Sequence, residues 1–75
     1  MAKYIISELG LAVVFDEILK HSDVALATRD DVVAAGFCDI LDDGRVRVYG
    51  RSISLDIGSR PEDADIIQVS LDRRI

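Results

Sequence analysis

Three arginines and a tyrosine alternate along one short segment, at Arg45, Arg47, Tyr49 and Arg51. Alternate residues of a β-strand point to the same side, so this spacing gathers the four side chains on one sheet surface. Aromatic rings flanked by arginine are typical of surfaces that bind single-stranded nucleic acid through base stacking and phosphate contact. The same residues are also typical of a solvated sheet face held by cross-strand pairs, or of a protein-contact surface.

Carboxylates offset the positive charge of this segment. Asp42 and Asp43 come shortly before Arg45, and the chain has 14 acidic against 9 basic residues, which gives a formal net charge of −5. Contact with phosphates requires a locally positive surface, so nucleic acid and anionic membranes are disfavoured as partners. An acidic surface favours a basic partner instead, including proteins that themselves hold nucleic acid.

The sequence contains no recognisable catalytic, cofactor-binding or metal-ligating set. We interpret His21, the only histidine, as a cap or surface residue at the end of a short helix. We expect the only cysteine, Cys38, to be a small hydrophobe on the core face, in a reducing compartment and without a disulfide. The segment 42–44 lacks the alternating oxygen ligands of a calcium loop. We therefore predict a protein that is not an enzyme and binds no cofactor.

The register of the hairpin that carries the arginines follows from its side chains, since a slip of one residue would turn each of them to the other face. A three-residue loop at 42–44, with Gly44 in the left-handed conformation, gives one apolar face and one polar face. The predicted pairs are Ile40 with Val46 and Cys38 with Val48 on the apolar face, and Asp39 with Arg47, Phe37 with Tyr49 and Leu41 with Arg45 on the other.

The apolar positions change parity after Gly50, from even numbers at 46 and 48 to odd numbers at 53, 55 and 57. A bulge at Gly50 would restore a continuous core face. This interpretation places Ala34 opposite Ile53 and Val32 opposite Leu55.

The remaining elements follow from turn and cap signals. Residues 3–7 and 11–15 have strand character around a turn at Leu9-Gly10. Asp16 is predicted to cap a helix that begins DEILKH and ends either near His21 or after Ala27. Ser59 and Glu62 have the spacing of a capping box, so a last helix is predicted to start there, with its core side at Ala64, Ile67 and Leu71.

Together these elements predict an α+β fold in the order β-β-α-β-β-α. It contains a small antiparallel sheet of four strands, or five if the bulged strand breaks in two, with one or two helices on one face. Residues 1–75 are expected to form a single domain, and its stability should be marginal because a chain this short buries only about 60% of its unfolded surface. The apolar run near the N-terminus is too short for a signal peptide or a membrane span, which predicts a cytoplasmic protein.

Several segments together resemble a family of short phage- and prophage-encoded proteins. They are VVF (13–15), HSDVA (21–25), AAGF (34–37), YGRSISL (49–55) and SRPEDA (59–64). The resemblance implies an accessory phage protein, and phage proteins of this size and charge are often inhibitors of host defence. Several anti-CRISPR proteins are likewise small, acidic and α+β, an analogy at the level of class alone.

The leading hypothesis is a non-enzymatic protein that binds and inhibits a host protein, such as a nucleic-acid-binding defence complex. Two alternatives stay open: a homodimer that associates through sheet edges, and a binder of single-stranded nucleic acid through the Arg/Tyr face. The candidate partner-binding residues are Phe37, Asp39, Asp42, Asp43, Arg45, Arg47, Tyr49, Arg51, Glu62, Asp63 and Asp65.

Overall fold

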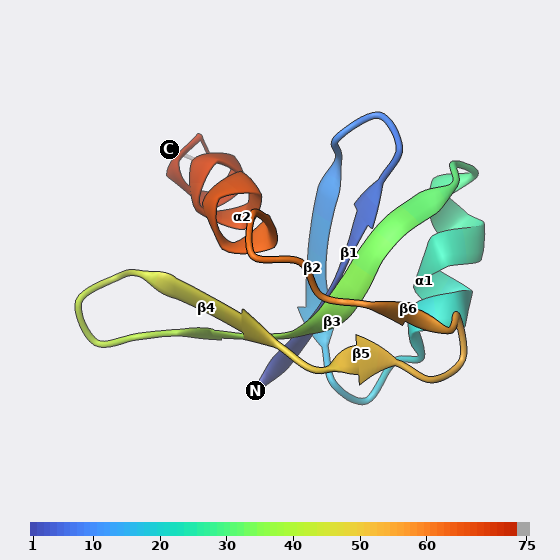
Figure 1. Cartoon of the computed structure of the whole chain (residues 1–75), viewed down its shortest axis with the longest axis horizontal. Coiled ribbons are helices and arrows are strands. Elements are labelled where there is room, and N and C mark those ends of the chain that lie inside the picture. The colour runs from blue at the N-terminus through green and yellow to red at the C-terminus, as the bar shows by residue number, and fades with distance from the viewer. Residues whose placement is uncertain (74–75) are drawn as a thin grey trace.

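The computed structural model describes residues 1–73 as an α+β fold with a four-stranded antiparallel sheet and two helices (Figure 1). The predicted fold class is confirmed, and the predicted element order is followed with one short hairpin added. The elements are β1 (Ala2–Ser7), β2 (Ala12–Asp16), α1 (His21–Thr28), β3 (Val32–Ile40), β4 (Val46–Tyr49), β5 (Arg51–Ser52), β6 (Ile57–Gly58) and α2 (Asp63–Asp72). The sheet order is β2-β1-β3-β4, while β5 and β6 pair with each other.

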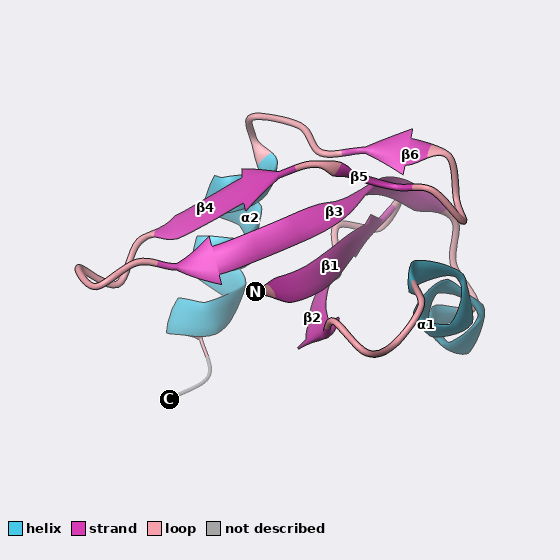
Figure 2. Ribbon diagram, turned by 90° about the horizontal axis from the view of Figure 1, so that it is seen from below, coloured by secondary structure: helices cyan, strands magenta, loops and turns pink. Residues whose placement is uncertain are grey.

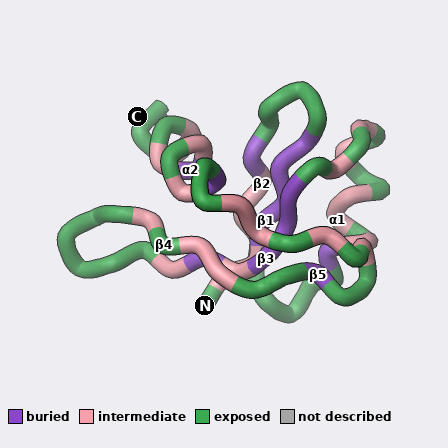
Figure 3. Tube along the Cα trace, in the orientation of Figure 1, coloured by how far each residue is buried: buried purple, intermediate pink, exposed green. Residues whose placement is uncertain are grey.

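The first strand of the chain is a central strand of the sheet. β1 pairs with β2 through a tight hairpin, in which Gly10 has a φ of +87°, and with β3 on its other side. Burial is concentrated along β1 and β3, whereas the tips of the long hairpins are exposed (Figure 3). β1 alternates between the two sheet faces, and both of its faces are buried, at Tyr4, Ile5 and Ile6.

The main core lies between the sheet and α2. Tyr4, Ile6 and Cys38 are on the sheet face that packs against Ile67, which is 1% exposed. Cys38 is thus a core residue, as predicted. Half-buried side chains of both layers extend this core, namely Ala2, Val14, Val46, Val48, Ile66 and Leu71.

A second helix lies on the opposite face of the sheet. His21, the first residue of α1, contacts Phe15 and Phe37, whose odd positions in β2 and β3 put them on the face away from α2. The two helices lie on opposite sides of β1, β2 and β3 in Figure 1. The prediction that a helix covers the apolar face of the sheet is therefore correct for α2. Helix α1 partly covers the opposite face of the sheet.

The predicted register of the β3–β4 hairpin is confirmed. Its pairs are Phe37 with Tyr49, Cys38 with Val48, Asp39 with Arg47 and Ile40 with Val46. The N–H of Leu41 donates to Arg45 O at 2.8 Å, and Gly44 has a φ of +87°. The three-residue loop with a left-handed glycine therefore sets which side chains share the outer face.

Gly50 interrupts the strand, but the predicted pairing beyond it is wrong. Gly50 has a φ of +73° and separates β4 from β5, after which the chain turns back at residues 53–56 to form β6. Ile53 is 90% exposed in that turn and does not face Ala34. Side-chain bonding explains the reversal, because Ser52 Oγ accepts the N–H of Leu55 at 3.1 Å and Asp56 adopts a φ of +55°.

The first helix begins later than predicted. Asp16 does not cap a helix: its Oδ1 accepts the N–H of Ile18 at 2.9 Å and its backbone oxygen accepts the N–H of Leu19 at 3.1 Å. Aspartate favours such local turns, and here the turn replaces the first helical turn. Helix α1 then starts at His21 and runs to Thr28, so the longer of the two predicted C-terminal limits is closer.

The last helix starts at Asp63, without the predicted capping box. Ser59 Oγ donates instead to Gly50 O at 2.8 Å, and Glu62 makes no side-chain cap bond. The Asp63 carboxylate bonds the segment before the helix, because its Oδ2 accepts the N–H of Arg60 at 2.7 Å. The serine therefore ties the chain back to the strand break at Gly50.

We predict that Gly50→Ala lowers the free energy of unfolding by about 2 to 4 kcal/mol. The new Cβ would lie 2.8 Å from Cδ2 of Phe37, in a conformation that already strains a side chain. Gly44→Ala is the matched control, because φ is also positive there but no atom lies within 4 Å, so we expect about 1 kcal/mol. Urea denaturation measures both, and equal losses would contradict the packing argument.

Candidate binding surface

Four rings form a continuous row across the α1 side of the sheet, and we call Phe15, His21, Phe37 and Tyr49 the aromatic row. The Phe15 and His21 centroids lie 5.5 Å apart at 81°, and those of His21 and Phe37 lie 5.8 Å apart at 87°. Phe37 stacks on Tyr49 at 5.9 Å and 23°. Both geometries are favourable for aromatic pairs, so the row behaves as one packed unit.

Backbone geometry holds the middle of the row. A Cβ on Gly36 would lie 2.7 Å from Tyr49 O, so the missing side chain lets the chain after β4 approach β3. His21 is 4% exposed, and its Nε2 lies 2.9 Å from Gly36 O. A carbonyl oxygen only accepts, so Nε2 carries the proton and donates. The expectation that His21 is a cap or surface residue is therefore wrong, because its ring fills the space under α1.

At the open end of the aromatic row, the ion pair of Arg47 and Asp39 lies beside the Tyr49 ring. The Arg47 guanidinium carbon lies 5.4 Å from the Tyr49 ring centroid, and Arg47 Nη2 donates to Asp39 Oδ2 at 2.7 Å. This bond with Arg47 lowers the pKa of Asp39, and the same bond raises the pKa of Arg47. Desolvation and the nearby Asp39 charge raise the pKa of Tyr49. The ring is therefore neutral at physiological pH and partly exposed, which suits contact with a partner.

The other arginines of the candidate set are also paired. Arg45 Nε bonds Asp43 Oδ2 at 2.8 Å, and Arg51 bonds Asp56. Since Arg47 pairs with Asp39, each arginine of the segment 45–51 has its own carboxylate. The positive charge suggested by the alternating arginines is thus locally neutralised.

The predicted acidic residues fall in two separate places. Asp42 and Asp43 lie at the exposed tip of the β3–β4 hairpin, where Asp43 Oδ1 also accepts the N–H of Arg45 at 3.0 Å. Glu62 and Asp65 are exposed at the start of α2. Asp63 is 0% exposed, so the folded chain does not present it to a partner.

Asp63 instead belongs to a buried network that the sequence did not reveal. Tyr4 Oη donates to Asp63 Oδ2 at 2.6 Å, and Arg60 Nε donates to Asp63 Oδ1 at 2.8 Å. Burial and this bond raise the pKa of Tyr4 well above its ordinary value. One signal was available: Tyr4 alternates with Ile6 on the core face, and a buried tyrosine hydroxyl usually has a partner.

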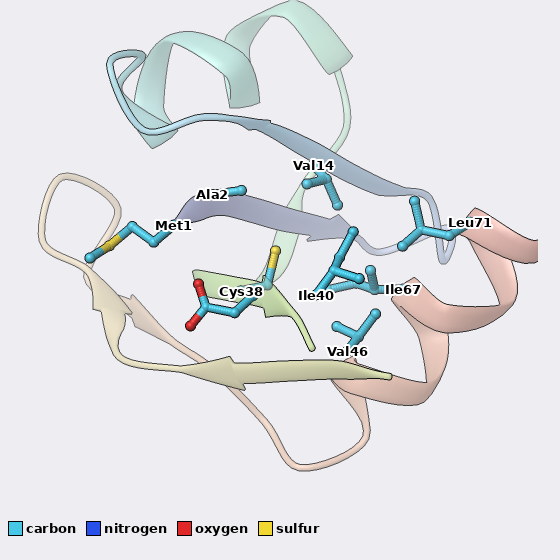
Figure 4. A pocket seen from close by; sticks show the side chains of 9 residues that line it. Met1, Ala2, Val14, Cys38, Ile40, Val46, Ile67 and Leu71 are labelled. Carbon is cyan, nitrogen blue, oxygen red and sulfur yellow. The ribbon is translucent and has the colours of Figure 1, made fainter. Parts of the chain in front are cut away.

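Grooves beside α2 add apolar surface to the molecule. One of about 440 Å³ lies between the sheet and α2, and the exposed residues Met1 and Ile40 are among those that line it (Figure 4). Its remaining lining residues are Ala2, Val14, Cys38, Asp39, Val46, Ile67 and Leu71. Burial raises the pKa of the Cys38 thiol, so this sulfur is a poor nucleophile.

Within residues 1–73, no group of three or more histidine, cysteine or acidic side chains could hold a metal ion. None of the helices in that range is long and apolar enough to cross a membrane. Comparison with protein-family models, curated proteins and solved structures finds no match to this chain. The aromatic row and the two exposed acidic clusters are the candidate binding features of the described residues.

We predict that Tyr4→Phe lowers the free energy of unfolding by about 1 to 3 kcal/mol, because the buried Asp63 carboxylate loses a donor. Tyr49→Phe is the matched control. Its hydroxyl lies at an exposed site, 3.7 Å from Met1 Sδ and near Asp39, and no buried group depends on it, so we expect a change within about 0.5 kcal/mol. Chemical denaturation followed by circular dichroism measures both, and similar losses would rule out a special role for the buried network.

Acid should weaken the fold partly through Asp39. Its folded pKa lies below the unfolded value, so the ion pair stabilises the fold above the unfolded pKa. That contribution is lost as the pH falls through the folded pKa, below about pH 4. We expect Asp39→Asn and Arg47→Gln each to flatten the decline of the urea midpoint in this range. The double variant should add nothing, and additive effects would show that the residues act separately.

Proposed function

We propose that the protein is a non-enzymatic interaction protein that binds, and thereby inhibits, a larger protein with a basic surface. The observation that carries this proposal is the end of the aromatic row, where Tyr49 lies between Phe37 and a neutralised arginine. A rigid, half-exposed tyrosine stacked on a second ring is typical of an anchor residue in a protein interface.

The charge distribution supports a basic partner. Four of the 14 acidic side chains, all aspartates, are in ion pairs among the described residues. The net charge of −5 therefore comes from carboxylates outside those pairs, including Asp42, Glu62 and Asp65. Such a field accelerates association with a positively charged groove and discriminates against acidic partners.

The paired arginines argue against the alternative of direct nucleic-acid binding. A protein that binds single strands must offer cations to phosphates, and affinity rises with the number of phosphates it neutralises. Here Arg45, Arg47 and Arg51 already face carboxylates. A phosphate would have to displace each of them while approaching an acidic molecule.

The resemblance to phage- and prophage-encoded proteins supports a host protein as the target. A protein that holds nucleic acid, such as a defence complex, has the basic groove that an acidic ligand of this size would fit. In this proposal, the chain acts in the cytoplasm by occupying that groove. It requires no catalytic residue and no cofactor.

The test is a pull-down from host lysate at low and high salt, with the bound proteins identified by mass spectrometry and their affinity then measured with purified components. We expect a specific partner that high salt releases. The variant Asp42→Asn/Glu62→Gln/Asp65→Asn should slow association at least about tenfold. Tyr49→Ala should weaken the complex mainly by faster dissociation.

The matched control removes the same number of charges elsewhere, in Glu8→Gln/Glu17→Gln/Asp23→Asn, where all three side chains are exposed. We expect it to slow association much less. If both triple variants slowed association equally, the association rate would depend on net charge alone, and the proposed binding surface would be wrong. Tight binding of an unstructured single-stranded oligonucleotide at physiological salt would favour the alternative.

A further inference from the structure

The two edges of the sheet differ in how they are closed. On β4, the backbone N–H of Val46 donates to Gln68 Oε1 of α2 at 3.0 Å. β4 is also short and ends at the left-handed Gly50. Short strands, kinks and side-chain covers all prevent a second chain from pairing with an edge. β4 is therefore partly guarded: with the Val46 N–H covered, Val48 is the only residue of β4 whose outward N–H is unbonded before the kink at Gly50.

The β2 edge has no such guard. The N–H of Ser7 donates to Leu11 O, so in an antiparallel pair the backbone groups of Leu11, Val13 and Phe15 point to β1. Those of Ala12 and Val14 then point away from the sheet, and no hydrogen bond within residues 1–73 reaches them from that side. The strand is apolar, with the sequence AVVFD, and β2 forms the free margin of the sheet (Figure 2).

We propose that the β2 edge pairs with the β2 edge of a second copy of this chain, antiparallel and about a two-fold axis at Val13. The register is set by Asp16, whose backbone oxygen already accepts the N–H of Leu19. Pairing must therefore use Ala12 and Val14, with Ala12 of one copy opposite Val14 of the other. In each such pair, the N–H of either residue donates to the carbonyl oxygen of the other. The interface is therefore symmetric, and the two sheets join into one.

Charge complementarity supports a second copy as the occupant. In this register Asp16 of one copy lies opposite Gly10 of the other. Arg73 lines a hollow of about 460 Å³ together with Gly10, Leu11 and Ala12. Asp16 has the even parity of the sheet face that carries α2, as Ala12 and Val14 do, so it approaches from the Arg73 side. Each copy thus contributes one Asp16 and one Arg73, which form two symmetric ion pairs.

The pairing also covers apolar surface. Leu11 is 56% exposed, while Val13 and Val14 are half-buried along the free edge. Val13 would face its own symmetry mate, at the close spacing of a pair without hydrogen bonds. Two chains of charge −5 repel each other, so the association is best measured at about 0.15 M salt, where the screening length is roughly 8 Å.

The decisive variant is Val14→Pro. It removes an N–H that makes no hydrogen bond within one copy, and proline is tolerated on an edge strand, so the monomer should fold as judged by circular dichroism. Val48→Pro is the matched control, because the same alternation points the Val48 N–H away from β3 on the partly guarded edge. By sedimentation equilibrium over a concentration series, we expect Val14→Pro to raise the dimer dissociation constant at least about tenfold and Val48→Pro to leave it unchanged.

A second measurement tests the ion pairs independently of the backbone. Asp16→Asn keeps the oxygen that accepts the Ile18 N–H and removes the charge. Asp16→Asn and Arg73→Gln should each weaken the dimer several-fold, and the double variant no more than either. A wild-type chain that is monomeric up to roughly 0.5 mM would overturn the proposal. Equal weakening by Val14→Pro and Val48→Pro would overturn it too.

Discussion

The buried carboxylate of Asp63 is the constraint on which the arrangement of the main core depends. An unpaired carboxylate at 0% exposure would be strongly unfavourable, so α2 must begin where the Tyr4 hydroxyl and the Arg60 side chain can both reach it. Tyr4 lies on the central strand β1, and this contact therefore fixes α2 over the middle of the sheet. Ile67 then enters the core one turn later, and the remaining apolar side chains of α2 follow from helical spacing.

The opposite face is organised by weaker and more distributed contacts. α1 is short, and its only buried residue is His21, whose ring replaces the aliphatic side chain usual in such a position. The aromatic row passes from this ring to the end of β4, so Phe37 contacts both the buried histidine and the half-exposed Tyr49. One face of the sheet is thus a conventional core, and the other is a partly open, polar-edged aromatic surface.

Features determined by neighbouring residues could be predicted from the sequence. The β3–β4 register follows from loop length and side-chain parity alone, and it placed Phe37, Asp39, Arg47 and Tyr49 on one face correctly. The start of α1 could not be predicted as readily, because the Asp16 carboxylate can accept backbone N–H groups equally well in a local turn or at the start of a helix. The turn after Ser52 was missed for the same reason. A short polar side chain overrode the apolar pattern, leaving Ile53 exposed.

The rest of the candidate surface depends on tertiary contacts between distant segments. Nothing local to His21 predicts that Phe37 will lie beside it, and nothing local to Asp63 predicts Tyr4, which is 59 residues away. That separation has a consequence for biosynthesis. The β1–β2 hairpin can form early, but the apolar side of β1 stays uncovered until α2 has been made. During translation this strand therefore exposes Tyr4 and Ile6 while the residues between β1 and α2 are being made, and the nascent chain should be most prone to aggregation or chaperone binding in that interval.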